Sequence, residues 1–278
     1  MEYILKTKNL RKTYGKTIAL DELSMNVPKG SIYGFVGKNG AGKTTLIRLV
    51  CGLQYPTDGE LKLYNIKHDD KKINDIRKNM GAVVETPSIY PDKTAYENLK
   101  IQFDILGIKE YEEIDELLKL VKLDDTGKKK AKDFSLGMKQ RLGIAVALCG
   151  NSEFLILDEP TNGLDPEGIK ELRTLLTNLA LKENIGILIS SHNLSELENF
   201  CTNICIIKNG EIIEISSVKD AKQPDKTSYL ITLNKTENIN EYLNEEVEII
   251  DNKTIRVYKN KENISNFIKL LIDKGYEV

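Results

Sequence analysis

Short apolar runs alternate with longer segments of helical spacing along most of the chain. Three runs are almost free of polar residues: Ile32–Val36, Phe154–Leu157 and Ile185–Ile189. Such runs are typical of parallel strands buried between two covering layers. Looser apolar patterns predict further strands at Ile4–Leu10 and Ile18–Val27, and a helix is expected to begin near Lys43. The pattern therefore predicts an α/β architecture.

The middle of the chain has a different pattern. Apolar residues recur at helical spacing in three segments: Ala95–Leu106, Tyr111–Val121 and Gln140–Cys149. Little between these segments has the character of a strand. Residues from about 86 to 150 are therefore predicted to form a largely helical insertion in the α/β domain.

The pattern changes again after residue 220. The polar segment Ala221–Lys226 contains a proline and is predicted to be a linker between a domain at 1–220 and a small accessory domain at 221–278. The expected elements of the second domain are strands at Tyr229–Leu233, Val247–Ile250 and Thr254–Tyr258, a turn at Asp251–Lys253 and a helix at Ile264–Ile272. A β-α-β-β-α module is one plausible arrangement.

Length and charge narrow the class of protein. The chain has 278 residues, enough for one large and one small domain. With 40 basic and 42 acidic residues its formal net charge is -2, so no global attraction to nucleic acid is expected. No apolar run approaches the ~20 residues needed to cross a bilayer, and the first residues lack the apolar stretch of a signal peptide. We expect a cytoplasmic protein whose membrane segments, if it needs any, belong to another chain.

Residues 37–44 read GKNGAGKT and fit the phosphate-loop pattern G-x-x-x-x-G-K-[ST]. Glycines let backbone N–H groups face phosphate oxygens, and the following helix adds the positive end of its dipole. Lys43 is predicted to reach the β- and γ-phosphates, and the Thr44 hydroxyl to ligate Mg²⁺. A chance match is the alternative, and the strand–loop–helix context weighs against it. The candidate ATP ligands here are Gly37, Asn39, Gly40, Gly42, Lys43, Thr44 and Thr45.

The apolar run Phe154–Leu157 ends in two adjacent carboxylates, Asp158 and Glu159. Asp158 is placed to hold Mg²⁺, as in other phosphate-loop enzymes. Glu159 is one residue further and is predicted to polarise the water that attacks the γ-phosphate. A strand that simply runs into a polar loop is the alternative, which the phosphate loop makes much less attractive.

Residues 134–141 read FSLGMKQR and resemble the signature motif of ABC transporters, usually LSGGQ followed by a basic residue and QR. Ser135, Gly137, Gln140 and Arg141 match the motif. Leu and Met replace a Gly and a Gln of the commonest form, and this variant resembles the branch that exports drugs and peptide antibiotics. Ser135 and the Gly137 backbone would open a helix and bind an anion. Ser135 acting only as an N-cap is a compatible, plainer interpretation.

The resemblance implies a head-to-tail homodimer, because in this family the signature motif binds the γ-phosphate of ATP held by the opposite subunit. Residues 160–166, PTNGLDP, resemble the D-loop, with Asp165 at the subunit contact. His192 stands where the family has its switch histidine, which would hydrogen-bond the γ-phosphate and hold Glu159 in place. Taken alone, His192 would be interpreted as structural. Tyr14 stands where the family stacks an aromatic ring on adenine.

One position departs from the usual family pattern. Residues 82–87 read AVVETP, so Glu85 replaces the glutamine of the Q-loop. This resembles the E-loop of transporters that confer lantibiotic immunity and of related bacitracin pumps. A carboxylate can still ligate Mg²⁺, but it adds a negative charge beside the γ-phosphate.

Together, the motifs predict an α/β P-loop NTPase of ABC type with a helical subdomain at about 86–150 and a small C-terminal α+β domain. The resemblance covers about residues 1–220. It implies an ATP- and Mg²⁺-dependent ATPase on the inner face of the cell membrane, which drives export of a peptide antibiotic or related amphiphile through a separate permease. Two alternatives stay open: a soluble ABC-type ATPase that acts on ribosomes or DNA, and a regulatory subunit that binds nucleotide without hydrolysing it.

Overall fold

A computed structural model describes residues 2–217, 227–234, 247–249, 253–259 and 261–277. These residues divide into two compact units, residues 1–218 and 219–278. The predicted linker, residues 221–226, lies outside the described residues.

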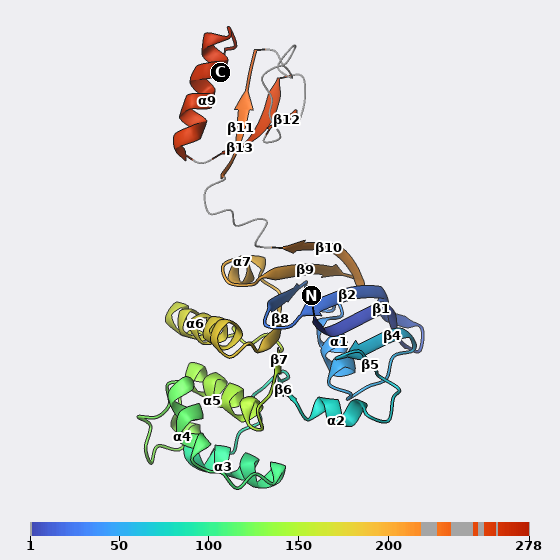
Figure 1. Cartoon of the computed structure of the whole chain (residues 1–278), viewed down its shortest axis with the longest axis vertical. Coiled ribbons are helices and arrows are strands. Elements are labelled where there is room, and N and C mark those ends of the chain that lie inside the picture. Colours follow the sequence, from blue (N-terminus) through green and yellow to red (C-terminus); the bar gives the residue numbers. More distant parts are fainter. Residues whose placement is uncertain (1, 218–226, 235–246, 250–252, 260, 278) are drawn as a thin grey trace. The chain divides into compact units, whose positions relative to one another are not determined.

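A six-stranded sheet forms the centre of the first unit, with strand order β10-β9-β3-β8-β7-β6 (Figure 1). Its strands are β3 (Ile32–Val36), β6 (Met80–Val83), β7 (Phe154–Leu157), β8 (Gly186–Ser191), β9 (Asn203–Lys208) and β10 (Glu211–Ser217). All neighbours pair in parallel except β10, which runs antiparallel to β9. The three apolar runs of the sequence thus form strands of one parallel sheet, as predicted.

Both faces of this sheet are covered, which explains why β3 and β7 are almost free of polar residues. Alternate residues of β3 enter two different apolar cores. Ile32 and Val36 pack into one core, and Tyr33 and Phe35 into the other. All four side chains are buried, so neither face of the strand tolerates a polar position.

The second core joins the central sheet to an antiparallel sheet of order β2-β1-β4-β5. Its strands are β1 (Tyr3–Tyr14), β2 (Thr17–Pro28), β4 (Asp58–Leu63) and β5 (Ile66–Lys67). Helix α1 (Lys43–Val50) contributes Leu46 and Leu49 to the same core as Leu5 of β1 and Phe35 of β3. The phosphate-loop helix is therefore held between the two sheets. A short helix α2 (Ile73–Arg77) follows β5.

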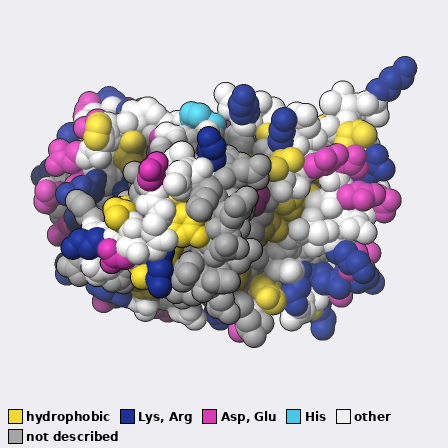
Figure 2. Space-filling model, turned by 90° about the horizontal axis from the view of Figure 1, so that it is seen from above, with side chains coloured by type: hydrophobic (Ala, Val, Ile, Leu, Met, Phe, Trp, Pro, Cys, Tyr) yellow, Lys and Arg dark blue, Asp and Glu magenta, His cyan; other side chains and the backbone are white. Residues whose placement is uncertain are grey.

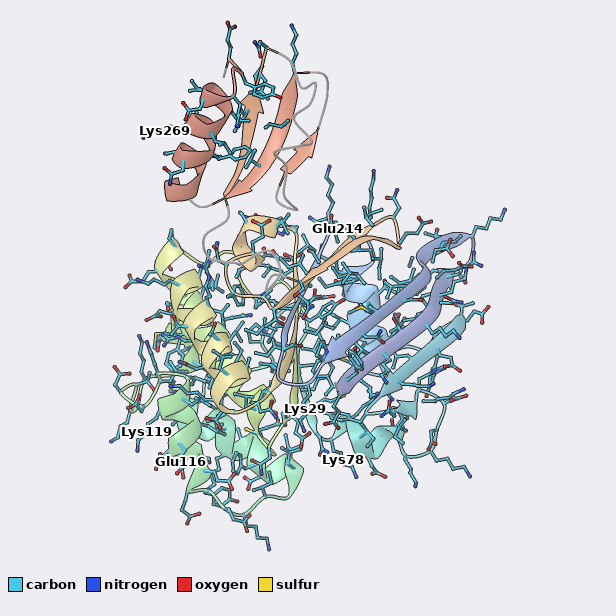
Figure 3. All side chains as sticks on the ribbon, turned by 45° about the horizontal axis from the view of Figure 1, so that its top comes forward. Lys29, Lys78, Glu116, Lys119, Glu214 and Lys269 are labelled. Atoms are coloured by element: carbon cyan, nitrogen blue, oxygen red, sulfur yellow. The ribbon has the colours of Figure 1, made fainter. Side chains whose placement is uncertain are left out.

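The predicted helical insertion contains α3 (Ala95–Leu106), α4 (Glu113–Leu120), a 3₁₀ turn at Ala131–Asp133 and α5 (Leu136–Leu148). Thr94 and Glu97 form a reciprocal capping box that fixes the start of α3. Helix α4 buries Ile114 and exposes Glu116 and Lys119, whose positions Figure 3 labels. Helix α5 begins four residues before the predicted start at Gln140, because the Ser135 side chain caps it.

Two further helices complete the first unit and were not predicted. Helix α6 (Pro166–Lys182) follows the D-loop segment, and Asp165 caps it by accepting a hydrogen bond from the backbone N–H of Gly168. Helix α7 (Leu194–Leu197) follows β8. In the described part of the chain, no helix combines the length and apolar character needed to cross a membrane.

The second unit has three antiparallel strands in the order β11-β13-β12 and one described helix. Its elements are β11 (Thr227–Thr232), β12 (Val247–Ile249), β13 (Thr254–Lys259) and α9 (Lys261–Asp273). Ile255 and Val257 of β13 pack with Phe267 and Leu271 of α9 in a separate core. The helix expected between the first two predicted strands falls on residues 235–246, and part of the predicted turn on 251–252, outside the described residues.

Basic and acidic side chains are interspersed on the face of the molecule that Figure 2 presents. This agrees with the formal net charge of -2.

Candidate functional site

The phosphate loop connects β3 to α1 across residues 37–42 and is held in a tight curl. Gly40 and Gly42 have backbone φ angles of 82° and 112°, which L side chains rarely adopt. A Cβ atom on Gly42 would also stand 2.6 Å from the carbonyl oxygen of Ala19. The second glycine of the motif is therefore required for both its conformation and its space.

A pocket of about 360 Å³ opens over this loop. It is lined by Ala19, Asn39, Gly40, Gly42, Lys43, Thr44, Thr45, Glu159 and Asn162. Six of these are among the predicted ATP ligands, and Glu159 is the predicted base. Ala19 and Asn162 were not predicted. Asn162 lies within the quoted D-loop motif, so its motif was recognised but its place in this pocket was not.

Lys43 is buried at the first position of α1, with a side chain only 6% exposed. Its Nζ donates to the carbonyl oxygens of Gly37 at 2.6 Å and Lys38 at 3.3 Å. It also forms an ion pair with Oε1 of Glu159 at 3.1 Å. The ammonium group is thus directed back over the loop, beside the predicted base.

Asp158 lies immediately after β7 and is 3% exposed. Its two oxygens are held by two different hydroxyls. Thr44 Oγ1 donates to Oδ2 at 2.9 Å, and Ser190 Oγ donates to Oδ1 at 2.6 Å. A buried carboxylate with both oxygens hydrogen-bonded has one fixed orientation.

Glu159 adopts a left-handed backbone conformation, with φ at 51°. A non-glycine residue in this region costs about 1 kcal/mol or more and needs support from its surroundings. The Glu159 N–H donates to Ser190 Oγ at 2.9 Å, and the side-chain Oε2 lies 2.7 Å from Nδ1 of His192. The turn directs the Glu159 side chain toward the pocket that Lys43 lines.

The charge state of Glu159 follows from its neighbours. Burial raises the pKa of its carboxyl, but the hydrogen bond with His192 and the charge of Lys43 outweigh burial and hold that pKa below its ordinary value. Glu159 is therefore a carboxylate at neutral pH, able to accept a proton.

A second link joins the loops that follow Glu159 and His192. Glu196 of α7 accepts a hydrogen bond from Thr161 Oγ1 at 2.6 Å and another from Asn193 Nδ2 at 3.1 Å. The D-loop segment and the switch segment are thereby tied to one carboxylate. No local signal in the sequence marks Glu196 for this contact.

The signature and D-loop residues meet in a different pocket, of about 340 Å³. This pocket is lined by Ser135, Gly137 and Asp165. The D-loop packs closely against the signature motif here, because a Cβ atom on Gly163 would stand 2.9 Å from Leu136 Cδ2. The Ser135 hydroxyl accepts from the Met138 N–H at 3.2 Å, which confirms that it is an N-cap. Apart from Gly37 and Tyr14, the predicted ATP ligands of one chain are thus divided between two pockets.

Two predicted residues lie apart from these groups. Tyr14, at the end of β1, is 44% exposed; its hydroxyl hydrogen-bonds Gln54 and Lys12 Nζ lies 5.2 Å from its ring centroid. The Glu85 carboxylate, predicted as a metal ligand, is bound by Arg48 Nη2 at 2.6 Å. Glu85 also has a left-handed backbone, with φ at 63°. The partner of Glu85 was not predicted, because Arg48 is 37 residues away in the sequence.

The fold and this site define a nucleotide-binding protein of the phosphate-loop class. The family model of the ABC transporters matches residues 20–162. The bacitracin transport ATP-binding protein BcrA of Bacillus licheniformis is 41% identical, over 100% of this chain and 92% of that protein. The lantibiotic transport ATP-binding protein SrtF of Streptococcus pyogenes is 44% identical, over 76% of this chain and 89% of that protein.

Solved structures agree with these relatives. The dimeric structure of the ATP-binding cassette MJ0796 in a post-hydrolysis state, bound to ADP and Pi, superposes with a TM-score of 0.68 at 27% identity, over 77% of this chain and 98% of that one. The chain belongs to the ABC transporter family, and it is an ATP-binding, ATP-hydrolysing subunit of that family.

Proposed function

We propose that this chain works as a homodimer on the cytoplasmic side of a separate permease and uses ATP hydrolysis to expel a peptide antibiotic or a related amphiphile. One observation carries the catalytic part: Glu159 lies within ion-pair distance of Lys43, with which it lines the phosphate pocket, and within hydrogen-bond distance of His192. For the cargo, the support is the similarity to the bacitracin and lantibiotic transport proteins. It extends over the whole chain for the bacitracin protein.

ATP binding begins with the phosphates. The curled loop presents backbone N–H groups, and the buried Lys43 supplies the positive charge for the β- and γ-phosphates. Tyr14 offers an exposed ring on which adenine would stack. When the γ-phosphate engages Lys43, the ion pair between Lys43 and Glu159 is weakened, and the carboxylate becomes available to the attacking water.

The oxygen donors near the phosphate loop fit Mg²⁺. Thr44 Oγ1 lies 2.9 Å from Asp158 Oδ2, next to the phosphate loop. Magnesium characteristically binds through one or two such oxygens together with substrate phosphates and water. The ion would neutralise charge on the transferred phosphoryl group. Glu85, engaged by Arg48, would join this set only after leaving that ion pair.

Hydrolysis then depends on the chain's own residues. Glu159 orients a water in line with the γ-phosphate and accepts its proton. His192 contacts Glu159 through Nδ1, which leaves Nε2 to face the phosphate. If Nδ1 donates to Glu159 and Nε2 donates to the phosphate at the same time, the His192 ring must be protonated on both nitrogens. Lys43 and the loop N–H groups stabilise the negative charge of the transition state.

Dimerisation would complete each site. Ser135 and Gly137 open α5 in the second pocket, where a helix N-terminus can bind an anion. Because this pocket is distinct from the phosphate pocket of the same chain, we infer that each signature pocket closes over the ATP of the partner copy. The dimeric form of MJ0796 supports this arrangement. Asp165, beside Ser135, would lie at the contact.

The relatives reported above are transport proteins, which favours this proposal over an ATPase that acts on ribosomes or DNA. The test is resistance in a sensitive bacterium that expresses the chain with the permease encoded beside it. The matched control carries Glu159→Gln, and the panel contains bacitracin, lantibiotics and other cationic peptides. Resistance to one class that is lost with the control supports export. Equal susceptibility of both strains to all peptides contradicts it.

A further inference from the structure

Ser190 stands next to the predicted catalytic carboxylates, although no motif marks it. It lies in β8, two residues before His192, and its side chain is completely buried. The backbone ladder between β7 and β8 ends at the pair Leu157 and Ile189. Ser190 is therefore at the point where the two strands no longer share backbone hydrogen bonds, next to Asp158.

The Ser190 hydroxyl uses both of its hydrogen-bonding capacities on consecutive residues of the neighbouring strand end. It donates to Asp158 Oδ1 at 2.6 Å and accepts from the Glu159 N–H at 2.9 Å. A hydroxyl is one donor and also an acceptor, which is what a carboxylate oxygen and an N–H together require. Alanine at this position would leave both groups without that partner.

The two contacts act on different properties of the site. The bond to Asp158 fixes the rotation of a carboxylate whose other oxygen is held by Thr44. The bond to the Glu159 N–H supports a left-handed backbone, with φ at 51°. That backbone conformation determines where the Glu159 side chain meets Lys43 and His192. One hydroxyl therefore sets the position of both carboxylates relative to each other.

We infer that Ser190 is a positioning residue for ATP hydrolysis. It holds the side chains of Asp158 and Glu159 in fixed relative positions. The carboxylate proposed to hold Mg²⁺ and the proposed base can then act on the same phosphate. The inference rests on the roles proposed above for those two residues. Ser190 is not among the residues that line the phosphate pocket, so we expect its loss to lower turnover far more than it weakens binding of ATP. A displacement of about 1 Å in a catalytic group can lower a rate about 100-fold.

The test compares kcat, KM for ATP and Tm of the full chain for Ser190→Ala, Ser190→Cys and Ser190→Thr. The alanine and cysteine variants remove or weaken the hydroxyl's bonds, and threonine retains them. Ser152→Ala is the control, because Ser152 is also buried and its hydroxyl donates a hydrogen bond to the carbonyl oxygen of Ala147, away from the two carboxylates. We expect kcat to fall at least tenfold in the alanine variant, with KM changed less than twofold, and to recover in the threonine variant.

With the residue at position 190 varied, kcat should decrease in the order serine, threonine, cysteine, alanine. The Ser152→Ala control should lower Tm without lowering kcat. The inference is overturned if Ser190→Ala keeps kcat within twofold of the wild type, or if kcat of all variants, the Ser152 control included, follows Tm alone. If the threonine variant does not fold, the cysteine and alanine variants still decide. A wild-type chain without ATPase activity would instead refute the proposed function itself.

Discussion

Replacing Glu159 by glutamine tests the assignment of the base with little change of shape. The amide retains the size of the side chain but can no longer accept the proton of the attacking water. General base catalysis contributes about 10²–10⁴ to a rate, equivalent to roughly 3–5 kcal/mol of transition-state stabilisation. We therefore expect kcat to fall at least 100-fold.

Binding of ATP should respond in the opposite direction. In the wild type, Oε1 of Glu159 lies 3.1 Å from Lys43 Nζ and competes with the γ-phosphate for that ammonium group. The variant removes this competing charge, so ATP should bind at least as tightly and keep the dimer closed. Phosphate release measures kcat, equilibrium binding of ATP measures affinity, and size-exclusion chromatography with ATP measures dimerisation. Turnover within threefold of the wild type would refute the role of Glu159 as the base.

The same substitution has a consequence for stability against pH. The pKa of Glu159 in the folded chain lies below its ordinary value, which is about 4.3 in the unfolded chain. The ionised carboxylate therefore stabilises the folded chain at pH values above its unfolded-state pKa, and this stabilisation is lost as the pH falls through the folded-state pKa. Below about pH 4, the unfolding free energy of the wild type should therefore decrease relative to that of Glu159→Gln. Urea unfolding at pH 7 and pH 3.5 measures it, and a difference that does not vary with pH contradicts the argument.

Three further substitutions address the fold, the adenine contact and the unusual acidic position. Gly81→Ala should lower the unfolding free energy by about 2–3 kcal/mol, or Tm by roughly 5–10 °C, because the new Cβ would stand 1.9 Å from the backbone oxygen of Ala147 in α5. An unchanged Tm would contradict this close approach of β6 to α5. Tyr14→Ala should weaken ATP binding about 5- to 100-fold, while Tyr14→Phe binds like the wild type; equal affinities would exclude stacking on this ring. Glu85→Gln removes the exposed ion pair with Arg48 and should change the unfolding free energy by less than about 1 kcal/mol; a larger loss in urea unfolding would show that the pair is structural.

The parts of the fold that could be predicted are those with strong local signals. Strands β3 and β7 begin and end where their apolar runs do, because both faces of each strand are buried. Helix α3 begins and ends as predicted, since a capping box at Thr94 and a glycine at Gly107 mark its ends. Strands β9 and β10 were not predicted. Strand β10 is largely exposed and mixes Ile with Glu, so it lacks the apolar run of the buried strands.

The site divides in the same way. The residues of contiguous motifs, such as Lys43 and Thr44, were found because the loop chemistry depends on short-range spacing. Contacts between distant segments were not found. Ser190 lies 32 residues from Asp158, and Arg48 lies 37 from Glu85. A serine in a strand has many ordinary roles, and only the pairing of β7 with β8 brings its hydroxyl to the two carboxylates.

The left-handed backbone of Glu159 is a further feature that sequence alone did not reveal. Glutamate has no intrinsic preference for positive φ. The conformation depends on the Ser190 hydroxyl and on the contacts of the side chain with Lys43 and His192, all of which are tertiary. A functional residue that departs from its local preference is expected where the chemistry requires a particular geometry.

The most direct test of the central claim is the ATPase activity of the chain bound to its permease in lipid nanodiscs, measured with and without added peptide. Wild type and Glu159→Gln are compared across bacitracin, a lantibiotic and an unrelated cationic peptide. Our account predicts that one peptide class raises wild-type ATP hydrolysis severalfold and that the variant releases no phosphate under any condition. Wild-type hydrolysis no greater than that of the variant, or hydrolysis that none of the peptides changes, would contradict it.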